Sequence, residues 1–409
     1  MKRLSLFLYS DIVGMKVYDE FDDNIGQLKD VYVTTEEGYP KFIGYRLKKD
    51  GYYIDYEFRT IRFYLQDNNI IKITVRGARE IIAQRYTYLL SKNLLDKKIV
   101  DINGKKVVTV RDLRVVEIAG EYKVLAVESG PLAKYKKIGL GQIAKIIMKL
   151  FHIEYKDSAI MWDDVESLEM VNDNLKLAIP YQKLSKLHPA DLADILEDLD
   201  SNHRRIVFES FDENLAADIL EEIEPKVQES LIKDMSDHKT HEVFDNMPND
   251  EIADILEELD EETQEKILMS LESTDANEIR ELMSYKDETV GSIMNKDFIS
   301  FNIDVTVGET IELIRELNPE DEVMYYIYII NEEEKLQGVV SLKRLLMNPH
   351  DVKLRDIMEE RVVTVNVEDS LEEVVQDFKK YDLVSLPVTD GEDKMIGIVV
   401  IHDIIDEIL

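Results

Sequence analysis

A strict twelve-residue repeat in the middle of the chain limits its fold more than any other feature. Eight consecutive units follow this period between residues 193 and 288, and the residues two and six places after the start of each unit are always apolar. The residue three places after the start is apolar in every unit except the last, which has Arg280. These three positions lie on one face of an α-helix. The units begin at Ala193, Arg205, Ala217, Glu229, His241, Ala253, Glu265 and Asn277.

Each unit has room for a helix of only about two turns. Helix-ending or helix-capping residues such as Pro189, Pro225 and Pro248 stand at the joins between units. A helix this short is not stable alone in water, so the units must stack on their neighbours. The repeat therefore predicts an α-helical solenoid over residues 185–287.

Two copies of one pattern fill residues 288–409. In each copy a short apolar strand leads into an amphipathic helix and then into two further strands. The third strand ends in Gly338-Val339-Val340-Ser341 in the first copy and in Gly397-Ile398-Val399-Val400 in the second. This alternation predicts two small α/β units, at 288–350 and 351–409.

The N-terminal part consists of short β-rich runs separated by turn-forming clusters, which predicts small barrels. Leu28-Lys29-Asp30-Val31 lines up with Val110-Arg111-Asp112-Leu113 at an offset of 82. We therefore expect a duplicated domain with copies at 1–88 and 89–184. The second copy carries an insertion at 130–155 with lysines on a helical apolar pattern. It is expected to pack on its own barrel or to dock a membrane partner.

Negative charge is concentrated in the second half of the chain. The net charge of −35 divides into +4 for residues 1–184, −22 for 185–287 and −17 for 288–409. Such a field repels nucleic acid and attracts multivalent cations. The chain has no cysteine, no Gly-rich phosphate loop and no Gly-x-Ser-x-Gly elbow, and its seven histidines are scattered, so we do not expect an enzyme.

No stretch reaches the roughly 18 uncharged apolar residues that a membrane-spanning helix needs. The first residues carry a charged tip with only a brief apolar run, which does not fit a signal peptide. We expect a cytoplasmic protein that reaches the inner face of the membrane through a partner.

The motifs also resemble known families. Gly14-Met15-Lys16-Val17-Tyr18-Asp19 followed by Gly26-Gln27-Leu28-Lys29-Asp30-Val31 is similar to the PRC-barrel family of adaptor domains. The two C-terminal copies are similar to CBS motifs. The Ala-Asp-Ile-Leu units upstream and Gly291-Ser292-Ile293-Met294 make residues 185–409 resemble the cytosolic region of the MgtE magnesium transporters. The resemblance implies a multidomain α+β fold with two PRC-like barrels, a helical solenoid and a tandem CBS pair.

The MgtE resemblance also implies a regulatory Mg²⁺ site made of carboxylates on the two sides of a cleft between solenoid and CBS pair. Mg²⁺ keeps several waters and takes few carboxylates, so such sites are shared between facing surfaces. Asp218 belongs to a repeated unit and is equally explained as a solvated position, and Asp403 stands where CBS domains place a carboxylate that grips a ribose. The implied ligands are Asp218, Asp250, Asp382, Asp403 and Asp406.

CBS pairs commonly bind adenine nucleotides, for which Ser341 and Asp403 are the candidate residues. Each half-site lacks one expected element, because the second copy has Val400 in place of a hydroxyl and the first has Arg344 in place of a carboxylate. An adenine nucleotide is therefore a weaker expectation than Mg²⁺.

The chain ends at Leu409, where the transporter family continues into a connecting helix and a membrane pore. We expect a stand-alone Mg²⁺-sensing regulator, as opposed to a truncated transporter, that acts on a membrane transporter for divalent cations and forms a homodimer through its CBS domains. The alternatives are an adenine-nucleotide sensor and a PRC-barrel adaptor.

Overall fold

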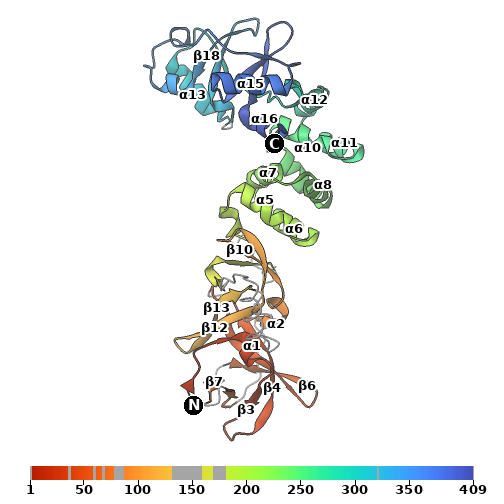
Figure 1. Cartoon of the computed structure of the whole chain (residues 1–409), viewed down its shortest axis with the longest axis vertical. Coiled ribbons are helices and arrows are strands. Elements are labelled where there is room, and N and C mark those ends of the chain that lie inside the picture. Colours follow the sequence, from red (N-terminus) through yellow and green to blue (C-terminus); the bar gives the residue numbers. More distant parts are fainter. Residues whose placement is uncertain are drawn as a thin grey trace, which may run out of the picture. The chain divides into compact units, whose positions relative to one another are not determined.

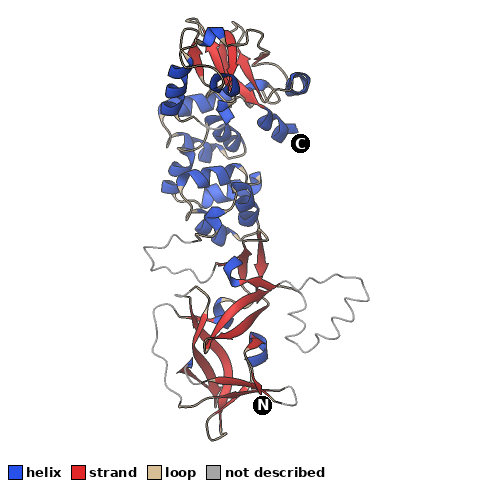
Figure 2. Ribbon diagram, turned by 90° about the vertical axis from the view of Figure 1, so that its left-hand side faces the viewer, coloured by secondary structure: helices blue, strands red, loops and turns tan. Residues whose placement is uncertain are grey.

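The computed structural model describes residues 2–35, 38–58, 61–66, 70–77, 87–130, 159–168, 181–319 and 322–408 (Figures 1 and 2). The chain divides into two compact units, Met1–Leu215 and Ala216–Leu409. The predicted insertion at 130–155 lies outside the described residues except for Gly130.

A curled sheet dominates the first unit, and the N-terminal segment joins its two edges. β1 (Lys2–Arg3) pairs with β7 at one end of the strand order, and β2 (Leu6–Leu8) pairs with β12 at the other end. Because β1 and β2 are one continuous stretch of chain, this segment closes the sheet into a barrel. The strands between these edges, in spatial order, are β7 (Arg62–Leu65), β8 (Ile71–Thr74), β3 (Lys16–Tyr18), β4 (Asn24–Thr34), β5 (Lys41–Lys49), β13 (Glu121–Glu128) and β12 (Asp112–Ile118).

Strands from both predicted copies therefore share one sheet and one core. The ring centroid of Phe63 lies 4.9 Å from that of Phe7 and 5.2 Å from that of Tyr122, which comes from the second copy and meets Phe63 edge to face. Phe58 and Phe42 complete this aromatic cluster. A separate three-stranded sheet of β10 (Lys98–Asp101), β11 (Lys106–Thr109) and β15 (Val165–Ser167) belongs to the second copy alone.

The two copies exchange their lead-in segments. In the first copy β2 runs into the short helix α1 (Tyr9–Ile12), and in the second β9 (Tyr88–Leu89) runs into α2 (Leu90–Asn93). Leu8 pairs with Arg114 of the second copy, and Leu89 pairs with Tyr32 of the first. Arg114 and Tyr32 are separated by the same offset of 82 as the sequence repeat. Within the shared sheet, each copy thus pairs its lead-in strand with a strand of the other copy.

The twelve-residue repeat forms helices as predicted. The residue two places after each unit start is buried in all eight units. Prolines occupy the first turn of two helices, and Asp200, Ser236 and Asp260 cap three others. The helices in the described part of this region are α5 (Pro189–Glu197), α6 (Ser201–Phe208), α7 (Glu213–Glu221), α8 (Pro225–Asp234), α9 (Asp237–Phe244), α10 (Asn249–Glu257), α11 (Glu261–Leu268) and α12 (Ser273–Leu282).

A second feature that recurs with the repeat is a side-chain hydrogen bond that links a helix to the one before it. Arg204, Gln228 and Gln264 each stand immediately before a unit start, and each donates to a carbonyl near the end of the preceding helix. For Gln264 the acceptors are Leu256 O at 2.7 Å and Leu259 O at 3.1 Å. These bonds satisfy carbonyls that a helix end leaves without an intrahelical donor.

The CBS region contains two α/β units of the same topology, as predicted. In each one the first strand is parallel to the second, and the second is antiparallel to the third. The first unit has β16 (Ser300–Asn302), α13 (Val307–Leu317), β17 (Tyr326–Ile330), β18 (Leu336–Ser341) and α14 (Leu342–Leu346). The second has β19 (Val365–Asn366), α15 (Leu371–Tyr381), β20 (Ser385–Thr389), β21 (Met395–Val400) and α16 (Ile401–Ile408).

The two CBS units interlock at their glycines. Asn295 bridges to Ile398 next to Gly397, and Glu359 bridges to Val339 next to Gly338. A Cβ atom on Gly397 would lie 2.8 Å from Asn295 O, and one on Gly338 would lie 2.8 Å from Met358 Sδ. Only glycine allows this close approach, which explains the glycine that opens each Gly-Val/Ile-Val motif.

Candidate functional site

The last solenoid helix, α12, meets the CBS pair at a charged junction. Lys296 Nζ, at the start of the first CBS unit, lies 2.6 Å from Glu281 Oε2 on α12. Tyr285, just after α12, packs on Gly291, where a Cβ atom would lie 2.6 Å from the tyrosine Cγ. Gly291 N donates to Val367 O at 2.9 Å, so the segment that follows α12 is fastened to the second CBS unit.

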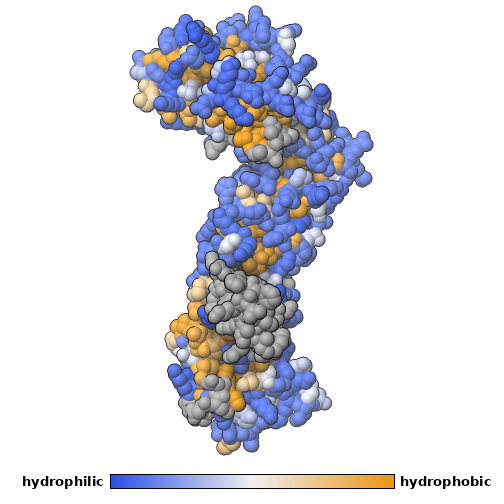
Figure 3. Space-filling view, in the orientation of Figure 1, coloured by the Kyte–Doolittle hydropathy of each residue, from blue (hydrophilic) through white to orange (hydrophobic). Residues whose placement is uncertain are grey.

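Carboxylates crowd this junction. Burial raises the pKa of Glu278 on α12, and the charges of Asp297 and Asp275 raise it further, while Lys296 opposes the shift. Asn249 Nδ2, at the start of α10, donates to Glu278 Oε2 at 3.3 Å. The junction therefore brings side chains of α10, α12 and the CBS region together. On the face shown in Figure 3, hydrophilic residues cover most of the helical and CBS parts.

The solenoid ligands implied by the family resemblance lie on two helices. Asp218 is exposed on α7. Asp250 is in the first turn of α10, next to Asn249, and its Oδ1 atom is buried. Of the two, Asp250 is the one whose neighbour in sequence, Asn249, contacts Glu278 at the junction.

The CBS ligands lie at helix ends. Asp382 has a left-handed backbone (φ 54°) at the end of α15, and its charge adds to burial in raising the pKa of Tyr326. Asp403 is in the first turn of α16, where its Oδ2 accepts a hydrogen bond from Val400 N at 3.2 Å. The side chain of Asp406 lies outside the described residues.

Within the described ranges, no three carboxylate or histidine side chains are gathered so that they could hold a metal ion. This holds for Asp218, Asp250, Asp382 and Asp403, the predicted Mg²⁺ ligands whose side chains the structure describes. The structure shows instead a junction at which acidic surfaces of solenoid and CBS pair lie close together around a lysine.

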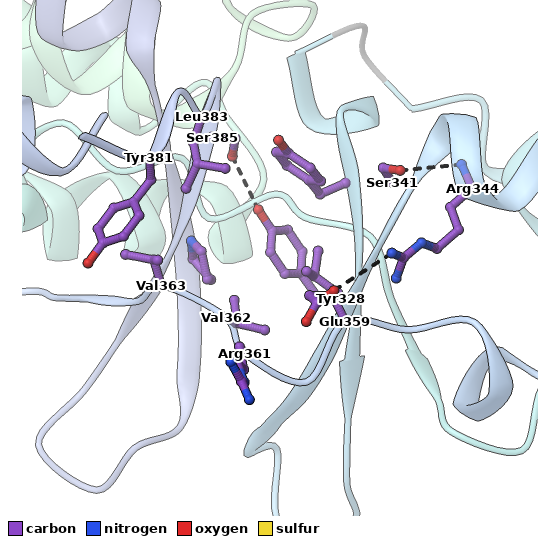
Figure 4. Close-up of a pocket in the computed structure, with 13 residues that line it drawn as sticks. Tyr328, Ser341, Arg344, Glu359, Arg361, Val362, Val363, Tyr381, Leu383 and Ser385 are labelled. Carbon is purple, nitrogen blue, oxygen red and sulfur yellow. Dashed lines mark hydrogen bonds and ion pairs between the residues drawn. The ribbon is translucent and has the colours of Figure 1, made fainter. Parts of the chain in front are cut away.

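A cavity of about 440 Å³ opens between the two CBS units (Figure 4). Ser341 lines it and caps α14 by accepting a hydrogen bond from Arg344 N at 3.3 Å. Asp403, the other predicted nucleotide residue, is not part of its lining. The lining residues are Tyr326, Tyr328, Val339, Ser341, Arg344, Glu359, Arg361, Val362, Val363, Tyr381, Leu383, Ser385 and Pro387.

The cavity combines aromatic walls with cations. Tyr328 is buried, its hydroxyl lies 3.2 Å from Ser385 Oγ, and burial raises its pKa. Arg344 and Arg361 lie at its edge in a region that is otherwise strongly acidic. Aromatic and apolar walls suit a planar ring, and guanidinium groups suit an anion. The sequence analysis did not assign Tyr326 and Tyr328 to a site, and the alternation of these two tyrosines along β17 is the signal that could have found them.

Comparison with family models assigns most of the chain. Residues 187–288 match the MgtE intracellular N domain, residues 290–351 and 354–409 match the CBS domain, and residues 5–79 match the PRC-barrel domain. No helix among the described residues is both long enough and apolar enough to cross a membrane.

Two curated relatives are magnesium transporters. The magnesium transporter MgtE of Enterococcus faecalis is 41% identical over 136 residues, which are 33% of this chain and 30% of that protein. The magnesium transporter MgtE of Thermus thermophilus is 32% identical over 226 residues, which are 54% of this chain and 50% of that protein. The chain spans half or less of the length of these relatives.

Two solved structures share the fold of the C-terminal part. The soluble part of a magnesium transporter is 33% identical, with a TM-score of 0.53 over 56% of this chain and 90% of that one. The cytosolic domain of the Mg²⁺ channel MgtE in complex with ATP is 28% identical, with a TM-score of 0.53 over 55% of this chain and 92% of that one. Residues 187–409 therefore belong to the MgtE family and correspond to its cytosolic N domain and CBS pair, and a PRC-barrel domain precedes them in the sequence.

Proposed function

We propose that this chain is a Mg²⁺-responsive regulator that controls divalent-cation transport through a membrane protein partner. The observation that carries the proposal is the junction at which Glu278 and Glu281 of α12 meet Lys296 and Asp297 of the CBS region. The relatives are magnesium transporters, which supports a role in magnesium transport.

Repulsion between facing carboxylates supplies the energy for the proposed response. Two carboxylates about 5 Å apart repel by roughly 3 kcal/mol at an effective dielectric constant near 20. A divalent cation shared between acidic surfaces removes this repulsion and favours the arrangement in which they lie closest. No group of three such ligands is gathered among the described residues, so the proposal includes a change in the separation of solenoid and CBS pair when Mg²⁺ binds.

Small-angle scattering of the full chain tests this proposal. We expect millimolar Mg²⁺ to lower the radius of gyration of the wild type, and the D250A/D403A variant to lose most of this compaction. D234A/D287A removes two exposed carboxylates and should compact like the wild type. Potassium chloride at equal ionic strength separates specific binding from screening. A wild-type radius of gyration that does not respond to Mg²⁺ would refute the mechanism.

We also propose that the chain forms a homodimer through its CBS pair. Leu313 and Leu317 are one helical turn apart on the same face of α13, and both are exposed in the single chain. A second copy of the same face would cover them.

The CBS cavity supports a second ligand, an adenine nucleotide. Its aromatic walls and two arginines suit a planar ring joined to phosphate, and a structural relative is in complex with ATP. Isothermal titration of the full chain with AMP and ATP tests this. We expect saturable binding that the substitution R361Q weakens, and the absence of any binding would rule the site out.

A further inference from the structure

The two CBS units place opposite charges at equivalent positions. Arg344 stands three residues after Ser341, in the first turn of α14, and Asp403 stands three residues after Val400, in the first turn of α16. The topology of the two units is the same, so the difference lies in the side chains. Only the unit with the arginine contributes this position to the cavity described above.

The guanidinium of Arg344 is held in place. Its Nη1 donates to Ile357 O at 2.9 Å, and its Nη2 lies 3.7 Å from Glu359 Oε2. The carbonyl bond fixes the plane of the group, and the distance to Glu359 is longer than a close ion pair. Arg344 therefore keeps N–H donors for a ligand in the cavity.

Arg361 provides a second positive group at the cavity. In Figure 4, Arg344 and Arg361 lie on different sides of the Tyr328 ring. A ligand with a planar ring against the tyrosines and two separated anionic groups offers one anion to each arginine.

We propose that this cavity selects an aromatic ligand with two separate anionic groups, of the class of nucleoside bisphosphates, and that Arg344 determines this specificity. The inference rests on the proposed nucleotide site and names its ligand class. In nucleotide sites a carboxylate accepts hydrogen bonds from free ribose hydroxyls, whereas an arginine accommodates a phosphate on the ribose. Arginine is suited to this because its planar fork binds phosphate bidentately.

Isothermal titration of the full chain with adenosine 3′,5′-bisphosphate, AMP and adenosine tests the proposal. We expect the bisphosphate to bind about tenfold or more tightly than AMP, since one charged hydrogen-bonded group contributes roughly that factor. R344Q should bring the two affinities together by weakening binding of the bisphosphate more than that of AMP, and R344D should prefer AMP. The matched control K343Q removes a neighbouring exposed cation that does not line the cavity and should bind like the wild type.

The possible outcomes separate the two levels of the proposal. Equal affinity of the wild type for bisphosphate and AMP, or an undiminished preference in R344Q, overturns the role of Arg344 and leaves the nucleotide site standing. Failure of all three compounds to bind overturns both. Thermal unfolding of each variant shows that it is folded, and R344D tests the charge at this position a second time if R344Q unfolds.

Discussion

Two buried aspartates at equivalent positions in the β repeat each bind the other copy's helix. Asp30 Oδ1 accepts from Ser91 N at 3.0 Å and from the hydroxyl of Tyr9 at 2.6 Å. Asp112 Oδ1 accepts from Ser10 N at 3.1 Å, and its Oδ2 accepts from the Ser10 hydroxyl. Each carboxylate thereby satisfies a helix N-terminal amide of the exchanged lead-in segment.

Removing the Asp112 carboxyl should destabilise the barrel. D112A leaves the buried amides of Ser10 and Leu113 without their acceptor, which costs about 1–3 kcal/mol of unfolding free energy. D112N keeps an acceptor oxygen and should lose less. Urea denaturation followed by tyrosine fluorescence measures both. Equal stability of D112A and the wild type would show that the exchange contributes nothing.

The same carboxyl should give the barrel a pH dependence. Burial raises the pKa of Asp112 above the value of an exposed aspartate, although bonds from Ser10 and Leu113 oppose the shift. A group with a raised folded pKa contributes stability below its unfolded pKa of about 3.9, and this is lost as the pH rises through the folded pKa. We expect the unfolding free energy of wild type minus D112N to fall as the pH rises above the unfolded pKa of about 3.9. A difference that rises with pH would contradict the assignment.

The repeat at an offset of 82 identified Asp30 and Asp112 as equivalent, but it did not reveal what they bind. Their partners Ser91 and Ser10 lie 61 and 102 residues away. Alternation of apolar and polar residues specifies which face of a strand is buried and carries no information about which copy supplies its neighbour. Tertiary packing determines which copy receives each lead-in segment, so the exchange is seen only in the folded structure.

At the scale of the elements, α12 contacts the CBS region through charged side chains. Lys296 provides a positive group between carboxylates, where the proposed mechanism places a divalent cation. The ion pair with Glu281 is therefore expected to hold α12 against the CBS region when Mg²⁺ is absent. Lys296 is largely covered, so solvent screens this pair less than a surface pair.

Replacing Lys296 with methionine should loosen this junction. K296M keeps the apolar stem but removes the charge, so Glu281 loses its ion-pair partner and Glu278 repels Asp297 without compensation. We expect faster hydrogen exchange in α12 without Mg²⁺, and a larger reduction of that exchange on adding Mg²⁺ than in the wild type. K286M, which removes an exposed lysine in the same linker, should behave like the wild type. Unchanged exchange in K296M would show that the ion pair does not hold the junction.

The helices of the solenoid were predictable because the apolar residues two, three and six places after each unit start share one face of a helix. The junction was not predictable to the same degree, for a reason of composition. With 85 acidic residues in the chain, the position of any one carboxylate says little about its neighbours. Asn249, Glu278 and Lys296 come together only through packing. Arg204, Gln228 and Gln264 were hidden because their position in the repeat is polar in some units and apolar in others, such as Leu192 and Ile252.

At the scale of the whole molecule, the same device recurs in the β repeat and in the CBS pair. In both, two copies exchange a leading segment and thereby form one folded unit. In the β repeat, Leu8 and Leu89 each pair with a strand residue of the other copy. In the CBS pair, Asn295 and Glu359 each bridge to a strand residue of the other unit. In each duplicated region these contacts give a partner within the same chain to a strand at the edge of a sheet, which lowers the tendency of that strand to pair with another molecule.

For association of two chains, α13 offers an exposed apolar helix face. Leu313 is 39% and Leu317 63% exposed, and a second copy of this face would remove both from water. We expect light scattering to give twice the chain mass of 47.5 kDa for the wild type. L313E/L317E should give the monomer mass, because it adds charge beside Glu312 and Glu316. M269E alters a methionine that is 79% exposed on the solenoid and should remain dimeric. A monomeric wild type at high concentration and saturating Mg²⁺, or a dimeric L313E/L317E, would exclude this face as the dimer interface.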